Sequence, residues 1–225
     1  GKFNMPSLIA VLFSVLVCTL LGVLIERLAY KPLREASTLS VLITAIGVSY
    51  FLQNAAQILW GSDTKIFPTM FDFGNIGLFN GQLQISMLTL ITILVCIVIM
   101  VVLTLFINKT KTGKAMRACS EDKATAQLMG INVDTTISIT FAIGSGLAAI
   151  ASVLLCSTYP AVNPTLGSMP GIKAFTAAVF GGIGSIPGAF IGGLLLGVLE
   201  TLAKAYISSQ MSDAIVFLVL IQECT

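Results

Sequence analysis

The sequence predicts an all-α membrane protein, a polytopic bundle of transmembrane helices, and three observations support this fold class. Only 10% of the 225 residues are charged, against about a quarter in an ordinary soluble domain. The mean hydropathy is +0.98. Five stretches contain no Asp, Glu, Lys, Arg or His, namely residues 3–25, 36–62, 73–108, 135–172 and 174–199. Because about 20 apolar residues cross a bilayer, each stretch is long enough to span once, and a soluble globule is excluded.

The composition also argues against several kinds of function. A net charge of +2 is too small to indicate binding to nucleic acid. The chain has no His, which is the commonest metal ligand and the usual general base near neutral pH. Its five cysteines show no paired spacing. We therefore expect no catalytic residue and no metal site.

The charges between the stretches predict the orientation of the helices. Successive connections carry three, one, five and one Lys or Arg residues. Short loops rich in Lys and Arg stay in the cytoplasm, so residues 26–35 and 109–134 are predicted inside, and 61–80 and 159–173 outside. The first helix then enters from outside, which predicts that further segments precede Gly1. The outer connection 61–81 is rich in Gly, Asn and Asp and predicts turns or a short hairpin.

The second stretch carries three amides, Gln53, Asn54 and Gln57, and Gln53 and Gln57 share one helix face. Amides at membrane depth need partners, so they line a transport path or form hydrogen bonds between helices. No ionisable side chain lies within any of the five stretches. Because ion-driven carriers often keep such residues in their helices, we expect the energy for transport to enter elsewhere.

The region from 159 to 206 departs from a plain helix. We predict a half-helix from Lys173 to Phe180, a Gly-rich break, and a second helix from Pro187 to Tyr206. Non-helical backbone at this depth is tolerated where it is buried in protein or lines a watery cavity. We therefore predict that the residues of the break, Gly181, Gly182 and Gly184, lie in the translocation path. Leu at either of the last two is expected to fill close backbone contacts and block transport.

The sequence alone leaves the direction of residues 174–186 open. The last apolar segment, 213–221, has only nine residues and cannot span a bilayer. The chain is therefore expected to be cut short at this end as well.

The charged segment 108–134 favours helix. Lys114–Cys119 and Glu121–Met129 are predicted as two short helices that meet at Ser120, a good N-cap residue, and Gly130 is a C-terminal stop. Taken alone, the segment is more often a solvated loop or a positive-inside anchor than a functional element.

In five blocks, the sequence resembles the inner-membrane permease subunit of bacterial ATP-binding-cassette importers for branched-chain amino acids. The blocks are ERLAYKPLR (26–34), LITAIGVS (42–49), GKAMRACSEDKATAQLMGIN (113–132), AFTAAVFGGIGSIPGAFIGGLLLGVLE (174–200) and DAIVFLVLI (213–221). The resemblance implies a single transmembrane permease domain over residues 1–225, with 108–134 as its cytoplasmic coupling loop. It also implies family helices before the point that matches Gly1 and beyond the point that matches Ile221.

The resemblance implies that the coupling loop docks on an ATPase subunit. A related motif reads Glu-Ala-Ala-x-x-x-Gly, and this chain keeps its small residues and Gly but lacks the Glu. The implied coupling residues are Arg117, Glu121, Asp122, Lys123, Ala126 and Gly130.

The family also implies the partners and the location. They are a second permease, two cytoplasmic ATPase subunits that carry ATP and Mg, a periplasmic binding protein, and the lipid bilayer of the bacterial inner membrane. No cofactor is implied on this chain, and no nucleic acid. Two alternatives stay open: a related permease for a simple sugar or urea, and a passive channel.

Overall fold

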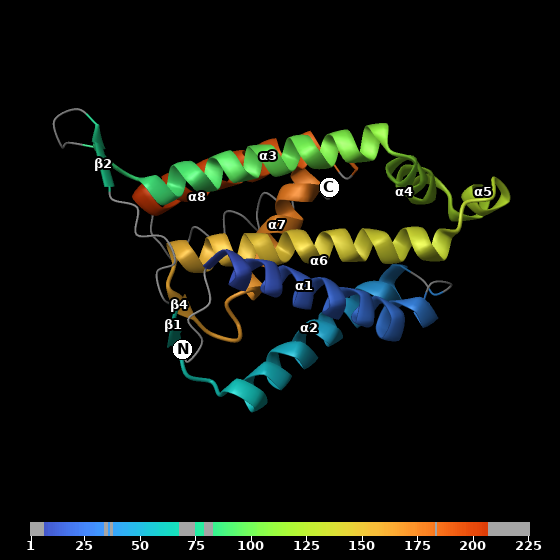
Figure 1. The fold of residues 1–225 in the computed structure, drawn as a ribbon, viewed down its shortest axis with the longest axis horizontal. Coiled ribbons are helices and arrows are strands. Elements are labelled where there is room, and N and C mark those ends of the chain that lie inside the picture. The colour runs from blue at the N-terminus through green and yellow to red at the C-terminus, as the bar shows by residue number, and fades with distance from the viewer. Residues whose placement is uncertain are drawn as a thin grey trace. The chain divides into compact units, whose positions relative to one another are not determined.

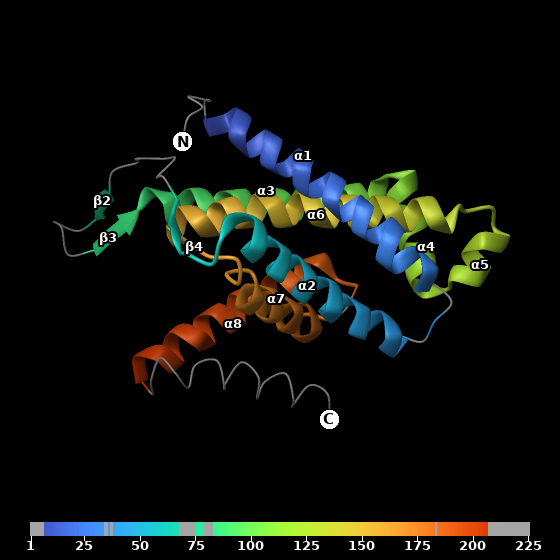
Figure 2. The same cartoon turned by 90° about the horizontal axis from the view of Figure 1, so that it is seen from below.

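A computed structural model describes residues 7–33, 36, 38–67, 75–78, 83–182 and 184–206 (Figures 1 and 2). Within this part of the chain, five helical segments are long and apolar enough to cross a membrane. They are Ile9–Leu33, Leu39–Trp60, Met87–Lys109, Val133–Thr158 and Ile186–Tyr206. The predicted all-α bundle is confirmed. The segment 213–221 lies outside the described residues.

Helix α1 (Ser7–Ile25) continues into a π-helical turn, η1 (Glu26–Tyr30), and a 3₁₀ turn, η2 (Lys31–Leu33). The first candidate span therefore runs past the end of the charge-free stretch and includes Glu26. Likewise, the last candidate span includes Glu200 and Lys204. The charged residues that bound the uncharged stretches therefore lie within the last turns of these two helical segments.

The chain divides into two compact units, and the first consists of Gly1–Val95 and Ile107–Pro164. In this unit α1 packs along α6 (Val133–Thr158), as both views show. The contact uses small residues: a Cβ on Gly146 would lie 3.3 Å from the hydroxyl of Thr19. Gly22 abuts Ser145 still more closely, so neither helix has room for a larger residue there.

Helices α2 (Thr38–Trp60) and α3 (Met87–Lys109) are joined by the predicted outer connection. Strands β2 (Asn75–Leu78) and β3 (Leu83–Ser86) form an antiparallel hairpin there, as predicted. Strand β1 (Lys65–Ile66) pairs with β4 (Ala161–Val162), which follows α6. Two connections that were both predicted to lie outside are therefore hydrogen-bonded to each other.

The second unit, Cys96–Phe106 and Thr165–Thr225, contains α7 (Ser168–Phe180) and α8 (Ile186–Tyr206). The predicted half-helix, break and second helix are confirmed, although α7 begins five residues before Lys173. Pro170 is in the first turn of α7, where a helix tolerates proline. The two helices run antiparallel: Gly188 lies against Gly181 and Gly192 against Ala177. They form a helical hairpin, which settles the direction of residues 174–186 relative to α8.

The glycines of this turn have two distinct roles. Gly181, Gly188 and Gly192 make close contacts, since a Cβ on any of them would lie within 2.5 Å of backbone atoms across the hairpin. Gly182 and Gly184 have φ of +88° and +99°, and a Cβ on them would meet nothing within 4 Å. The expectation that these two fill close contacts is therefore wrong. They are glycine because the tight turn needs a left-handed backbone.

Candidate functional site

The cytoplasmic loop forms two helices, α4 (Lys111–Glu121) and α5 (Lys123–Leu128), which meet at Asp122. Asp122 is extended, with φ −152°, and its carboxylate accepts hydrogen bonds from the Ala124 N–H at 2.9 Å and from the Thr125 hydroxyl. The predicted junction at Ser120 is wrong, because the Ser120 hydroxyl donates to the Arg117 carbonyl inside α4. Asp122 is the better cap, since its carboxylate satisfies two donors at once.

Gly130 ends α5, as predicted. It has φ +82°, and its N–H donates to the Gln127 carbonyl at 3.0 Å. The next N–H, of Ile131, donates to the Ala126 carbonyl at 3.1 Å, which completes a Schellman motif. Asn132 then caps α6 through the Thr135 N–H. The loop is thus joined to a membrane helix without a flexible linker.

The six predicted coupling residues fall into two groups. Asp122 and Gly130 shape the loop, and Ala126 is buried at 3% exposure. The other three, Arg117, Glu121 and Lys123, are exposed. Arg117 and Glu121 lie 3.9 Å apart, with side chains 70% and 77% exposed, so their mutual attraction is screened by solvent and contributes little stability.

Two exposed apolar residues of this loop were not predicted. Leu128 is 88% exposed and Met129 is 79% exposed, at the end of α5 and outside every candidate span. Apolar side chains in contact with lipid are expected on α1 or α3, whereas an exposed apolar tip on a charged loop is typical of a surface that a protein or a membrane surface covers. The available signal was two large apolar residues directly before a Gly stop, in a segment too short to span.

The two segments predicted to be cytoplasmic lie together. They share the wall of an open hollow of about 870 Å³, lined by Lys31 and Pro32 from the first segment and by Lys123, Ala124, Gln127 and Gly130 from the second, with the start of α6. This arrangement agrees with the orientation derived from the distribution of Lys and Arg.

Glu26 was assigned to the charged cytoplasmic cluster, but the structure buries it completely. The hydroxyl of Ser138 on α6 donates to its Oε2 at 2.7 Å. The hydrogen bond joins η1 to α6, the helix that α4 and α5 also contact. No local pattern marks this burial, because it depends on the crossing of two helices far apart in the sequence.

Two of the three amides of α2 donate hydrogen bonds within their own helix. Gln53 Nε2 donates to the Ser49 hydroxyl at 3.3 Å, and Asn54 Nδ2 donates to the Tyr50 carbonyl at 2.8 Å. Gln57 is half-buried. A role of these amides in the translocation path remains a prediction.

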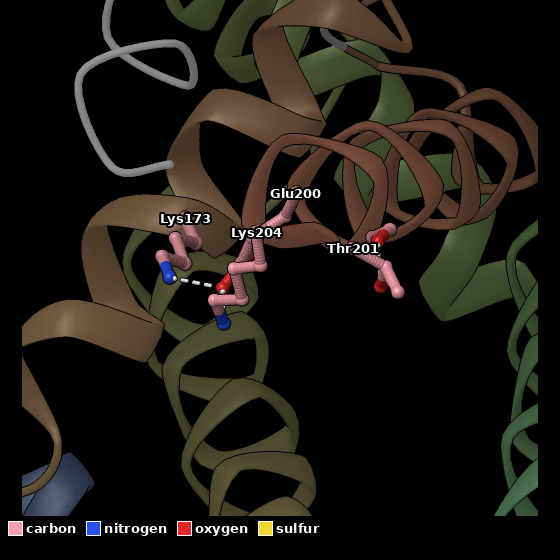
Figure 3. A network of polar contacts seen from close by, with 5 residues as sticks. Lys173, Glu200, Thr201 and Lys204 are labelled. Atoms are coloured by element: carbon pink, nitrogen blue, oxygen red, sulfur yellow. Dashed lines mark hydrogen bonds and ion pairs between the residues drawn. The ribbon is translucent and has the colours of Figure 1, made fainter. Parts of the chain in front are cut away.

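A charged cluster lies between α7 and α8 (Figure 3). Oε1 of Glu200 accepts from Lys173 Nζ at 2.8 Å and from Lys204 Nζ at 2.5 Å. The side chain of Glu200 is 19% exposed, that of Lys173 is 30% exposed, and that of Lys204 is 50% exposed. Sequence reasoning missed the cluster because Lys173 and Glu200 only flank the same uncharged stretch, and their contact depends on the hairpin.

A small pocket adjoins this cluster. Its volume is about 230 Å³, and it is lined by Lys173, Ala174, Ala177, Gly193, Leu196, Gly197 and Glu200. In the described part of the chain, no group of three or more His, Cys, Asp or Glu side chains is placed to hold a metal ion.

Comparisons with known proteins agree with this geometry. A family model described as "Branched-chain amino acid transport system / permease component" matches residues 3–222. The permease protein LivH of the high-affinity branched-chain amino acid transport system of Salmonella typhimurium is 45% identical over 210 residues, 92% of this chain and 68% of the relative. BraD, the corresponding permease protein of Pseudomonas aeruginosa, is 46% identical over 227 residues, 98% of this chain and 73% of the relative.

A more distant relative has another cargo in its name. The autoinducer 2 import system permease protein LsrD of Photorhabdus laumondii is 26% identical over 230 residues, 96% of this chain and 65% of that protein. No solved structure matches the chain.

Proposed function

Because the chain belongs to the family of permease components of branched-chain amino acid transport systems, we propose that it forms half of the membrane path of an ATP-driven importer for Leu, Ile or Val. The protein is a multi-pass protein of the inner membrane. A second permease completes the path, and a periplasmic binding protein delivers the cargo from outside.

The ATPase drives transport through the α4–α5 loop. The observation that carries this proposal is the exposed tip of Leu128 and Met129 at the end of α5. Apolar side chains that are solvent-exposed on a charged loop gain free energy when a partner covers them, and the exposed charges of Arg117, Glu121 and Lys123 orient that partner. ATP and Mg bind to the partner, and this chain supplies no catalytic residue.

Movement passes from the loop to the membrane helices by rigid-body displacement. Both helices of the loop contact α6, and only the four residues 129–132, which include the Schellman turn at Gly130, separate α5 from α6. A short connection of this kind transmits a displacement of the ATPase surface instead of absorbing it.

Docking is tested with the double variant L128E/M129E. Two carboxylates on the tip oppose burial at a protein contact, so the variant is expected to insert into membranes but to lose co-purification with the ATPase subunit. The control is I66E, which places one carboxylate on a similarly exposed apolar residue, 85% exposed, in the predicted outer connection, and it is compared with L128E alone as well as with the double variant. Full ATPase binding by L128E/M129E would contradict the docking role of the tip.

The cargo is tested in vesicles that contain the assembled transporter and the binding protein. We expect ATP-dependent uptake of labelled leucine, competed by isoleucine and valine but not by ribose or urea. Competition by ribose or urea would assign the chain to a permease of another cargo. Uptake without ATP would identify a passive channel.

A further inference from the structure

We propose that the pocket between α7 and α8 binds the cargo amino acid as a zwitterion during its passage, with Lys173 and Glu200 as the groups that recognise its two charges. This inference rests on the proposed function and deepens it, since it assigns a binding site within the permease.

The lining of the pocket matches the chemistry of a branched-chain amino acid. Its apolar part is made of small or aliphatic residues, Ala174, Ala177, Gly193, Leu196 and Gly197, of which Ala177 and Leu196 are 9% and 5% exposed. One positive and one negative side chain complete the lining. A site with apolar walls and a few placed polar groups is typical of small-molecule binding. A sugar or urea carries no charge and could not replace either member of this ion pair.

The ion pair allows an exchange of partners without a change in net charge. In the structure Lys173 Nζ and Glu200 Oε1 are 2.8 Å apart. When the cargo enters, its carboxylate takes the place of Glu200 beside Lys173, and its ammonium takes the place of Lys173 beside Glu200. Each side chain keeps a partner of opposite charge, so no ion is left unpaired at membrane depth, where unpaired charge is costly.

Lys204 is a positioning residue in this exchange. It contacts the same Oε1 of Glu200 from one turn further along α8. It does not line the pocket. While Lys173 turns to the cargo, Lys204 therefore holds Glu200 in place and in its ionised form.

The place of the pocket in the fold also favours binding. Transporters commonly bind their substrates at helices that are interrupted within the membrane, and the α7–α8 hairpin is such an interruption. The pocket lies toward the open end of the hairpin, away from the turn at Gly182 and Gly184. At that end, α7 begins directly after residues 159–167, which belong to the connection predicted to face outside. A binding protein delivers cargo from the same side.

The alternative is that the ion pair only fastens α7 to α8, and the double variant K173M/E200M separates the two roles. Methionine has a similar length and is apolar, and apolar replacement of a largely buried ion pair is often neutral or stabilising. Lys204 loses its partner Glu200 in this variant, but its side chain is 50% exposed and can be solvated. A fastening role predicts normal stability and normal uptake. A cargo site predicts normal stability with uptake lost.

The experiment uses the complete transporter in vesicles with leucine-loaded binding protein. The measured quantity is leucine taken up per ATP hydrolysed, because a loss of folded complex lowers both rates and leaves their ratio unchanged. In K173M/E200M and in E200Q we expect this ratio to fall at least about tenfold, the effect of losing one charge-assisted hydrogen bond to the cargo. K204M should lower the ratio less, and K204R should restore it.

The matched control is T201V, which changes a polar residue adjacent to Glu200 that points away from the cluster (Figure 3) and lies outside the pocket lining. It should keep the wild-type ratio. If K173M/E200M does not fold, E200Q decides, since Gln still accepts a hydrogen bond from Lys173. Wild-type ratios in the variants would overturn the cargo site alone, whereas absence of leucine uptake by the wild-type transporter would overturn the proposed function itself.

Discussion

Single glycines determine whether the α7–α8 hairpin closes. A Cβ on Gly188 would lie 2.0 Å from the Gly181 carbonyl oxygen, a distance that requires the backbone to move. A Cβ on Gly197, on the same helix, would meet nothing within 4 Å. The spacing of glycines in the sequence does not distinguish the two positions, but the close approach of the two backbones does.

We therefore predict that G188A destabilises the protein by about 1–3 kcal/mol, the range for overpacking a close contact. G197A should be neutral or slightly stabilising, because alanine is the better helix former. Thermal unfolding of the two variants in the same detergent measures the difference. Equal unfolding temperatures would show that the hairpin relaxes around an added methyl group.

Asp122 makes the loop sensitive to acid. Hydrogen bonds from the Thr125 hydroxyl and from the backbone N–H groups of Ala124 and Thr125 lower the pKa of the Asp122 carboxyl below its ordinary value. A lowered pKa in the folded state means that the cap stabilises α5 above the unfolded pKa of about 4, and that this stabilisation is lost as the pH falls toward the folded value.

The expected result is faster hydrogen exchange of residues 123–128 below about pH 4, after correction for intrinsic rates. D122N keeps a capping side chain that does not titrate, so its exchange should be independent of this transition. Identical pH profiles for D122N and the wild type would exclude Asp122 as the titrating group.

At the scale of elements, the exposed charges of α4 can be changed without loss of helix stability. Because Arg117 and Glu121 are both largely exposed, reversing them together keeps an i, i+4 pair on α4 while it inverts the charges shown to a partner. R117E/E121R should therefore leave the helix intact and reduce ATP-dependent uptake.

Circular dichroism and uptake in vesicles, measured on the same preparation, test this separation. The single variant K111Q, which removes one exposed charge at the start of α4, is the control. Wild-type uptake by the double reversal would mean that the charge order on α4 plays no part in coupling.

The elements also show where sequence reasoning reaches its limit. The spans, the half-helix and the outer hairpin follow from local patterns: absence of charge, Gly and Pro spacing, and turn residues. The burial of Glu26 and the Lys173–Glu200 contact do not follow from local patterns. Each depends on the packing of two helices against each other, which a local sequence pattern does not reveal. The junction at Asp122 was misplaced by two residues, since Ser, Asp and Glu are all acceptable at a helix start and only the backbone decides among them.

For the whole molecule, orientation is the property that function requires. Segments predicted inside share one hollow, and segments predicted outside share the β1–β4 ladder, so the topology is consistent on both sides. In a cysteine-free background, a cysteine at Lys65 should react with a membrane-impermeant maleimide in intact cells. A cysteine at Lys111 should react only after permeabilisation. Reaction of both in intact cells would contradict the assigned orientation.

The π turn at the end of α1 sets the phase of the first span. The Lys31 N–H donates to the Glu26 carbonyl, five residues back, so η1 contains one residue more than an α-helical turn. Deleting that residue would restore a continuous α-helix and rotate everything on one side of the deletion by about 100° relative to the other. Lys31 and Pro32, which line the hollow beside α5, would then be rotated relative to Gly22 and Glu26, which face α6. The one extra residue therefore sets the rotation of the residues after η1 relative to those of α1. The length of the ERLAYK segment is as strictly constrained as its composition.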